Sequence, residues 1–218
     1  MIEKFAVIFD MDGVLVDTNG FILDSFNTFL KPYGLSIDGE EFKGYLGITA
    51  KGLVERWKKE YGIVFDENFI KEETTRMHLD SLKGYVVDPH LTGLLRNLKE
   101  NNVPMAVGTS SPRKRAEKIL DILGIRNFFP SVITGDDVST HKPDPELFLK
   151  VAEILGIEPH MCAVIEDAEN GIEAAKRGGM KAIGYTTKYH KREELKKADL
   201  IIDNFTELSY DKIKRLFE

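Results

Sequence analysis

The chain has 218 residues, of which 42% are hydrophobic and 30% are charged, and its formal net charge is -6. This length and composition are typical of a folded protein with one core and a smaller insertion, and they exclude a disordered chain. The acidic balance disfavours a broad surface for nucleic acid or an anionic membrane, so we expect neither as a partner.

The first apolar run, from Phe5 to Phe9, is too short for a membrane span or for the apolar part of a signal peptide. We therefore expect a cytoplasmic protein, and a monomer. The single cysteine, Cys162, cannot form an internal disulfide. Its apolar neighbours predict a buried position in a strand.

Short apolar runs alternate with amphipathic segments along most of the chain. Gly, Pro, Asp or Ser bounds the runs, which predict strands at 5–9, 103–108, 131–134, 162–165, 181–185 and 200–202. Between them, apolar residues at helical spacing predict helices, one of which has Ser111 as its expected N-cap. Alternating strands and helices predict an α/β fold with a doubly wound parallel sheet.

The segment from about Asp17 to Tyr85 interrupts this alternation. It contains several helical patterns, and its aromatic residues, such as Phe26 and Trp57, are spaced as the apolar face of a helix. We interpret it as an inserted helical domain with its own small core. The expected organisation is a core domain of residues 1–16 and 87–218 and a helical cap domain of residues 17–86.

Four groups of polar residues follow the apolar segments, either directly or within the next loop. In an open parallel sheet, the carboxyl ends of the strands form the edge that binds ligands. Two acids at such an edge can act as metal ligands, as a nucleophile, or as acid and base. The four groups are Asp10 with Asp12, Thr109 to Ser111, Lys142 beside Pro143, and Glu166 with Asp167.

Each group alone also has a purely structural explanation. Asp12 before Gly13 suits a solvated turn, Ser111 suits a helix cap, and Lys142 suits an exposed loop. The functional interpretation therefore depends on finding all four groups together and in this order.

The four groups resemble the four motifs of the haloacid dehalogenase superfamily. They match Asp10-x-Asp12-Gly13, the hydroxyl of Thr109, Lys142 in Lys-Pro-Asp-Pro, and Glu166-Asp167 followed by Gly171. The helical insertion stands where this family has a type-one cap. The phrase from Phe9 to Thr18 is similar to the branch that contains beta-phosphoglucomutase and the sugar-phosphate phosphatases.

The resemblance implies a Rossmann-like core and a phosphatase acting on a small phosphorylated metabolite, with sugar phosphates as leading candidates. Asp10 would attack phosphorus and form an aspartyl phosphate. Asp12 would protonate the leaving oxygen and then deprotonate water. Thr109 and Ser110 would bind the phosphate, and Lys142 would supply a fixed positive charge.

The same resemblance implies Mg²⁺ as the cofactor. Its ligands would be Asp10, the backbone carbonyl of Asp12, and Asp167, with Glu166 supporting the ion from its outer shell. The helical insertion would act as a lid. Its predicted substrate-facing loop contains Gly47 and Ile48.

Two alternatives remain open at the level of the sequence. The first is a beta-phosphoglucomutase, whose cap histidine and substrate-loop arginine are replaced here by Phe21 or Ile22 and by Ala50. The second is a non-catalytic protein that binds phosphorylated metabolites, because a fold does not establish a function. The presence of Asp10, Asp12 and Lys142 argues against the second.

Overall fold

The computed structural model describes residues 4–45, 48 and 50–218. Two compact units are found: Met1–Asp17 with Val86–Glu218, which we call the core unit, and Thr18–Tyr85, which we call the helical unit. Among the described residues, no helix is both long and apolar enough to cross a membrane.

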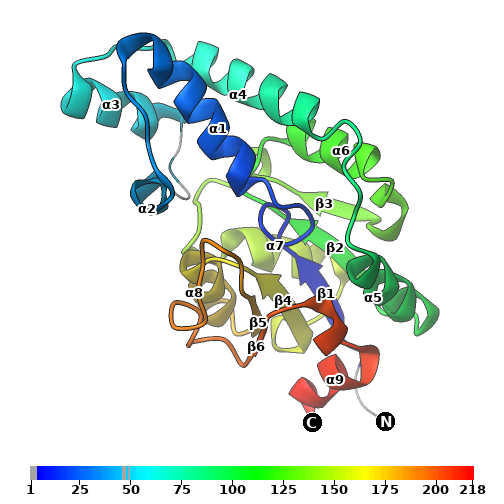
Figure 1. The fold of residues 1–218 in the computed structure, drawn as a ribbon. Helices are drawn as coiled ribbons and strands as arrows, with labels where there is room; N and C mark the ends of the chain where they lie inside the picture. The colour runs from blue at the N-terminus through cyan, green and yellow to red at the C-terminus, as the bar shows by residue number, and fades with distance from the viewer. Residues whose placement is uncertain (1–3, 46–47, 49) are drawn as a thin grey trace. The chain divides into compact units, whose positions relative to one another are not determined.

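The core unit is built on a six-stranded sheet with the order β3-β2-β1-β4-β5-β6, in which neighbouring strands are parallel (Figure 1). This confirms the predicted α/β fold with a doubly wound sheet. The strands are short and largely buried, as expected for a sheet covered on both faces. They are β1 Ala6–Phe9, β2 Met105–Gly108, β3 Ser131–Ile133, β4 Cys162–Glu166, β5 Lys181–Tyr185 and β6 Leu200–Ile202.

Four strand boundaries differ from the sequence-based prediction by one or two residues, and two of the strands, β1 and β3, are each one residue shorter than predicted. β2 begins at Met105 rather than Val103, because Pro104 has no N–H to donate to a neighbouring strand. Its carbonyl still accepts a hydrogen bond from Val7 N at 3.0 Å. β4 continues one residue further than predicted, to Glu166, which is paired with Gly184 of β5.

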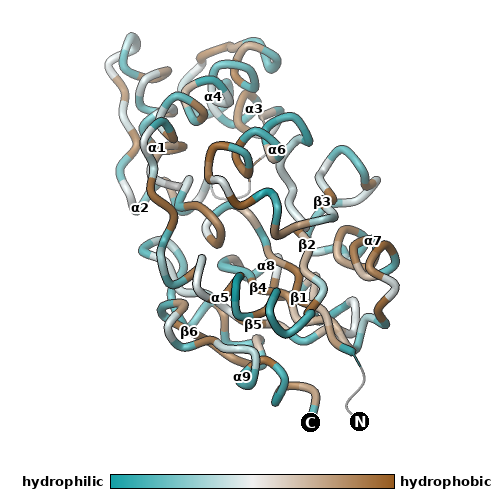
Figure 2. Tube along the Cα trace, turned by 90° about the vertical axis from the view of Figure 1, so that its right-hand side faces the viewer, coloured by the Kyte–Doolittle hydropathy of each residue, from teal (hydrophilic) through white to brown (hydrophobic). Residues whose placement is uncertain are grey.

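Two helices of the core unit, α7 and α8, pack their apolar stripes against the sheet. Leu147, Phe148 and Val151 of α7 join the same buried cluster as Ile8 of β1 and Ile172 of α8. The tube of α7 is accordingly brown over much of its length in Figure 2. The core helices are α5 Pro89–Glu100, α6 Arg113–Ile122, α7 Glu146–Leu155, α8 Glu169–Arg177 and α9 Tyr210–Lys214.

The predicted helix cap at Ser111 is wrong. The residue that precedes α6 is Pro112, whose side chain makes no capping hydrogen bond, and the first backbone N–H of α6, that of Arg113, donates to Oδ2 of Asp136 at 2.8 Å. The Ser111 hydroxyl instead donates a hydrogen bond of 2.7 Å to Oδ2 of Asp12. The sequence pattern predicts that Ser111 caps a helix, but its side chain instead binds Asp12 of the first acidic motif.

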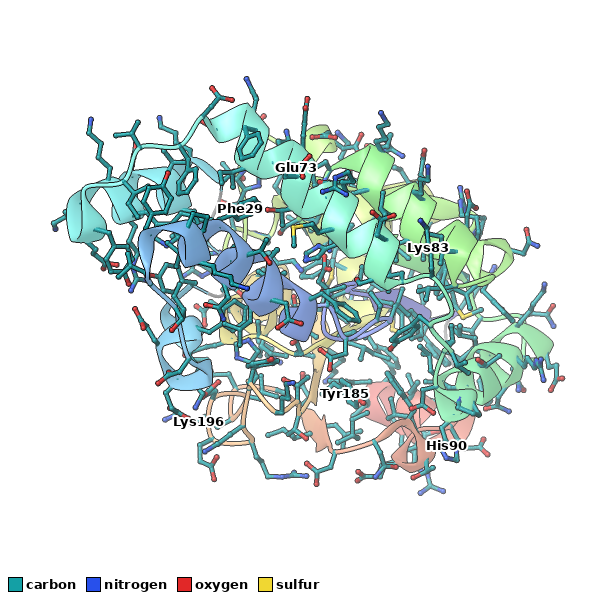
Figure 3. The ribbon with its side chains drawn as sticks, turned by 45° about the horizontal axis from the view of Figure 1, so that its top comes forward. Phe29, Glu73, Lys83, His90, Tyr185 and Lys196 are labelled. Atoms are coloured by element: carbon teal, nitrogen blue, oxygen red, sulfur yellow. The ribbon has the colours of Figure 1, made fainter. Side chains whose placement is uncertain are left out.

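The helical unit has a compact aromatic core of its own. Trp57 is fully buried and meets Phe26 edge-on, with ring centroids 5.4 Å apart. Phe29, labelled in Figure 3, lies 6.1 Å from the rings of both Phe65 and Phe69. The helices are α1 Asn19–Leu30, α2 Gly39–Phe42, α3 Ala50–Tyr61 and α4 Glu67–Ser81.

We predict that Cys162 is inert towards thiol reagents in the folded protein. The residue is fully buried in β4, and burial raises the pKa of its thiol to about 12, so the reactive thiolate is scarce at neutral pH. Labelling by an aromatic disulfide should be slow in buffer and complete in urea. Equally fast labelling under both conditions would contradict the buried position.

Candidate active site

The sheet order brings the first and last acidic motifs side by side. β1 lies between β2 and β4, with Phe9 paired with Val107 on one side and with Ile165 on the other. The backbone N–H of Asp10 donates to the Ile165 carbonyl at 2.9 Å, which continues the pairing beyond β1. Asp10 therefore stands beside Glu166 at the carboxyl edge of the sheet, where open α/β sheets bind ligands.

Lys142 joins two of these carboxylates. Its Nζ donates hydrogen bonds of 2.6 Å to Oδ1 of Asp10 and of 2.6 Å to Oε1 of Glu166. The side chains of all three residues are at most 8% exposed, so the contacts are shielded from water. The second oxygen of Glu166 accepts from the backbone N–H of Ala168 at 2.8 Å, which fixes the carboxylate from both ends.

Asp12 is held by a different set of donors. Arg115 Nη2 donates to Oδ1 at 2.7 Å and Arg115 Nη1 donates to Oδ2 at 2.8 Å, a two-pronged contact of the kind that guanidinium groups form with carboxylates. The hydroxyl of Ser111 adds a third donor to Oδ2. Asp10 and Asp12 are thus held by separate cations, although only one residue lies between them.

Gly13 leaves the space that Asp167 fills. Its φ is +86°, a conformation that favours glycine, and a Cβ at this position would lie 2.0 Å from Oδ2 of Asp167. The last motif therefore contacts the turn of the first motif. Gly171 has the same relation to Glu166, because its Cβ would lie 1.8 Å from Oε1.

We predict that Gly13→Ala lowers the unfolding free energy by more than its backbone conformation alone explains. The matched control is Gly156→Ala, because Gly156 also has a positive φ, +64°, but no neighbouring atom lies within 4 Å of the place that its Cβ would take. The control should lose about 1 kcal/mol of unfolding free energy, measured in urea. Gly13→Ala should lose more and also lose activity, and equal losses in the two variants would contradict the close approach of Asp167.

The hydroxyl groups after β2 stand at the same edge of the sheet. Thr109 is 1% exposed, and its Oγ1 accepts a hydrogen bond of 3.1 Å from the backbone N–H of Ser111. A hydroxyl that accepts in this way still has one proton to donate to an anion. Ser110 is exposed and follows directly.

The acidic cluster is electrostatically strained. Burial raises the pKa of Asp10 to about 8, with Lys142 opposing the shift and Glu166 adding to it. Burial also raises the pKa of Asp167, and the neighbouring charges of Glu166 and Asp10 act in the same direction. For Lys142, burial alone would lower the pKa, but Asp10 and Glu166 outweigh it and raise the pKa, which keeps the ammonium charged.

The charges of this cluster do not balance. Four carboxylates, those of Asp10, Asp12, Glu166 and Asp167, face the two cations Lys142 and Arg115. The formal excess of two negative charges matches the charge of one divalent metal ion. Among the described residues, no three acidic, His or Cys side chains already form a closed ligand set, so such an ion would also need backbone or water oxygen ligands.

Arg115 was not among the site residues predicted from the sequence. A signal was available, because Arg115 precedes Ile119 by four residues and so lies on the apolar stripe of α6, where a charged residue needs a partner. The side chain is 8% exposed and finds that partner in Asp12, 103 positions away in the sequence.

The substrate-facing loop predicted from the sequence lies in the helical unit. Gly47 falls outside the described residues. Ile48 is half-buried, and its backbone N–H donates to the Tyr45 carbonyl at 3.1 Å. Arg56 of α3 is engaged within the same unit, because it pairs with Glu60 at 2.9 Å and lies over the Tyr45 ring.

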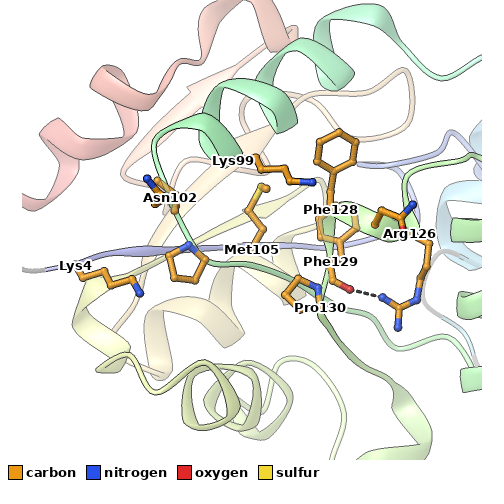
Figure 4. Close-up of a pocket in the computed structure, with 11 residues that line it drawn as sticks. Lys4, Lys99, Asn102, Met105, Arg126, Phe128, Phe129 and Pro130 are labelled. Atoms are coloured by element: carbon orange, nitrogen blue, oxygen red, sulfur yellow. Dashed lines mark hydrogen bonds between the residues drawn. The ribbon is translucent and has the colours of Figure 1, made fainter.

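A pocket of about 780 Å³ lies elsewhere in the core unit (Figure 4). Residues just before β2, including Val103 and Pro104, line it together with Phe128 and Arg126. The guanidinium of Arg126 donates to the Phe129 carbonyl, as the dashed line shows. Because the acidic cluster lies at the carboxyl ends of β1 and β4, this pocket at the amino end of β2 is not part of it.

Comparison with known proteins identifies the kind of fold that carries this cluster. The chain is 31% identical over 208 residues to validoxylamine A 7'-phosphate phosphatase from Streptomyces hygroscopicus subsp. limoneus, covering 95% of this chain and 97% of that protein. It is 33% identical over 184 residues to the fructose-1-phosphate phosphatase YqaB of Escherichia coli, covering 84% and 97% of the two chains.

A solved structure is also similar to this chain over its whole length. The beta-phosphoglucomutase of Clostridium difficile superimposes with a TM-score of 0.84 at 29% identity, covering 100% of this chain and 97% of that one. The family model for haloacid dehalogenase-like hydrolases matches residues 7–185 of this chain. This range includes every motif residue from Asp10 to Asp167. The resemblance inferred from the motifs is thereby confirmed, and the chain belongs to the haloacid dehalogenase-like hydrolase family.

Proposed function

We propose that this protein is a magnesium-dependent phosphatase that hydrolyses a small phosphorylated metabolite, with a sugar phosphate as the preferred class of substrate. The observation that carries the proposal is the pair of acids at the end of β1, each held by its own cation: Asp10 by Lys142 and Asp12 by Arg115. The relatives named as phosphatases of phosphorylated carbohydrates support the substrate class.

The arrangement suits hydrolysis in two steps. In the first, a carboxylate oxygen of Asp10 bonds to phosphorus while the bond from phosphorus to the ester oxygen breaks. Its electron pair goes to that oxygen, which takes a proton from Asp12. In the second, a water oxygen bonds to phosphorus, its proton goes to Asp12, and the electron pair of the breaking bond returns to Asp10.

The neighbouring groups offset the charge of the phosphate. The Lys142 ammonium lies 2.6 Å from Asp10, so it is placed to act on an anion bound to that residue. Thr109 has a proton to donate, and Ser110 would bind the phosphate from the same loop. Glu166 acts through Lys142, which it holds in place at 2.6 Å.

The residues of the cluster fit a magnesium ion. Asp10, the backbone carbonyl of Asp12, and Asp167 supply the hard oxygen ligands that Mg²⁺ prefers, and the formal charge excess of two matches the ion. When bound, the ion would offset negative charge on the phosphate. The helical unit, Thr18–Tyr85, enters the proposal as the cap that selects the substrate.

A phosphosugar mutase is the competing function, and the similarity to beta-phosphoglucomutase is the observation that favours it. The two functions differ in the acceptor of the phosphoryl group, which is water in one and a second sugar hydroxyl in the other. The sequence favours water, because the helical unit has Phe21 and Ile22 where the mutases have a histidine.

The proposal is tested by phosphate release from a panel of phosphate esters, with Mg²⁺ and with excess EDTA. We expect release from at least one sugar phosphate that EDTA abolishes and that added Mg²⁺ restores. Conversion of glucose 1-phosphate into glucose 6-phosphate without phosphate release would favour the mutase. Phosphate release unaffected by EDTA would contradict the metal requirement.

A further inference from the structure

We propose that Arg115 is a positioning residue that fixes the carboxyl group of Asp12 for both proton transfers, an inference that rests on the proposed phosphatase function. The geometry is that of a fork: two guanidinium nitrogens meet the two oxygens of Asp12, at 2.7 and 2.8 Å. Because the N–H bonds of a guanidinium lie in one plane, two such contacts to one carboxyl group fix its orientation as well as its place.

Arg115 stands where an arginine is unfavourable without a partner. It is the third residue of α6, and the amino-terminal end of a helix carries partial positive charge. Its side chain is only 8% exposed, and removing a guanidinium from water is unfavourable unless an anion pairs with it. Side chains in helices lean towards the amino-terminal end, which directs Arg115 back to the loop that follows β2. The contact with Asp12 offsets these costs.

Ser111 ties the arrangement to the phosphate-binding loop. Its hydroxyl donates to Oδ2 of Asp12 and also contacts Nη1 of Arg115. The backbone N–H of Ser111 donates to Thr109 at 3.1 Å. Asp12 is therefore fixed relative to the residue that would bind the phosphate, which is the relation that a proton donor to the ester oxygen requires.

The two contacts with Arg115 still allow the carboxyl group of Asp12 to donate and accept a proton. Each proton transfer uses one oxygen of the carboxyl group, and the other oxygen can stay in contact with the guanidinium. Asp12 is 26% exposed, against 8% for Asp10, so a leaving group or a water molecule can reach it. Without Arg115, Asp12 would sample other rotamers, and a displacement of about 1 Å can cost about 100-fold in rate.

Two substrates with different leaving groups distinguish a role of Arg115 in positioning Asp12 from a purely structural role. An alkyl phosphate needs a proton on its leaving oxygen, whereas 4-nitrophenyl phosphate releases a stable phenolate without one. In Arg115→Met, kcat for an alkyl phosphate should fall about tenfold to 100-fold. With 4-nitrophenyl phosphate, the first turnover should stay within about threefold, since only the later attack of water needs Asp12. A burst of 4-nitrophenol and an accumulated phosphoenzyme are therefore expected.

Three further variants make the test specific. Arg113→Met is the matched control, because Arg113 is on the same helix and pairs with Asp137 and Glu117 rather than with Asp12. Its kinetics should resemble those of the starting protein. Arg115→Lys keeps the charge but not the fork, so it should behave like Arg115→Met. In Asp12→Asn, adding Arg115→Met should cause little further loss, because both changes act through Asp12.

Several results would overturn the inference. If Arg115→Met lowers the rate of the first turnover equally for the alkyl phosphate and for 4-nitrophenyl phosphate, with no burst of 4-nitrophenol, Arg115 acts on phosphate binding or on folding. Full activity in Arg115→Lys would mean that only the charge is needed. A crystal structure of Arg115→Met with Asp12 unmoved would contradict positioning without reference to activity. An inactive starting protein with a disordered Asp12 in Arg115→Met would instead contradict the phosphatase function and with it the role in proton transfer, while it would confirm that Arg115 holds the Asp12 carboxyl group in place.

Discussion

Asp10→Asn is expected to lower kcat by at least about 10⁴-fold for every phosphate ester that the protein hydrolyses. The amide has the size of the carboxylate but no anionic oxygen to attack phosphorus, so the first step is lost. The protein should stay folded, since burial raises the pKa of Asp10 to about 8 and so disfavours the charged form, which the amide of the same size lacks. The measurement is phosphate release at saturating substrate and Mg²⁺.

The control for this change is Asp121→Asn, at an exposed aspartate near the end of α6 that belongs to none of the four motifs. It should leave kcat unchanged. Substantial activity in Asp10→Asn, at a tenth of the starting rate or more, would mean that another group attacks phosphorus or that no covalent step occurs.

Lys142→Met is expected to lower both stability and activity. Without the ammonium, Asp10 and Glu166 are left as neighbouring buried carboxylates with no cation between them. Removing one partner of a buried ion pair costs about 3–5 kcal/mol of unfolding free energy. Loss of a charge that offsets the phosphate should lower kcat by about 10²–10³-fold as well.

Urea unfolding and kcat separate the two effects of Lys142→Met. The double variant Lys142→Met with Glu166→Gln removes one of the two stranded carboxylates, so it should recover part of the stability but none of the activity. Lys118→Met, at an exposed position of α6, is the control and should change neither quantity. A Lys142→Met protein as stable as the starting one would contradict the buried contact with Asp10 and Glu166.

The sheet and the motif residues were predictable because they follow local rules. Continuous apolar runs predicted the strands within one or two residues, and the largest error, at Val103, came from Pro104 rather than from the pattern. Residues at the carboxyl ends of parallel strands must share one edge, so the proximity of Asp10 and Glu166 followed from the strand prediction.

The contacts of Ser111 and Arg115 were not predictable in the same way. Local sequence assigned Ser111 to a helix cap, whereas its hydroxyl bonds Asp12, 99 positions away. Arg115 carried a warning, a charge on an apolar helix stripe, but the stripe does not say which carboxylate is its partner. Long-range side-chain pairing depends on where α6 lies relative to the loop that follows β1, and sequence periodicity contains no information about that.

Asp10 should carry the phosphoryl group during turnover, and peptide mapping of acid-quenched protein tests this directly. Asp12→Asn, which should slow the attack of water, is mixed with 4-nitrophenyl phosphate and Mg²⁺, quenched in acid and digested. We expect a phosphate adduct on the peptide that contains Asp10, formed within one turnover and absent in Asp10→Asn. An adduct on another residue, or phosphate release with no adduct at any quench time, would contradict it.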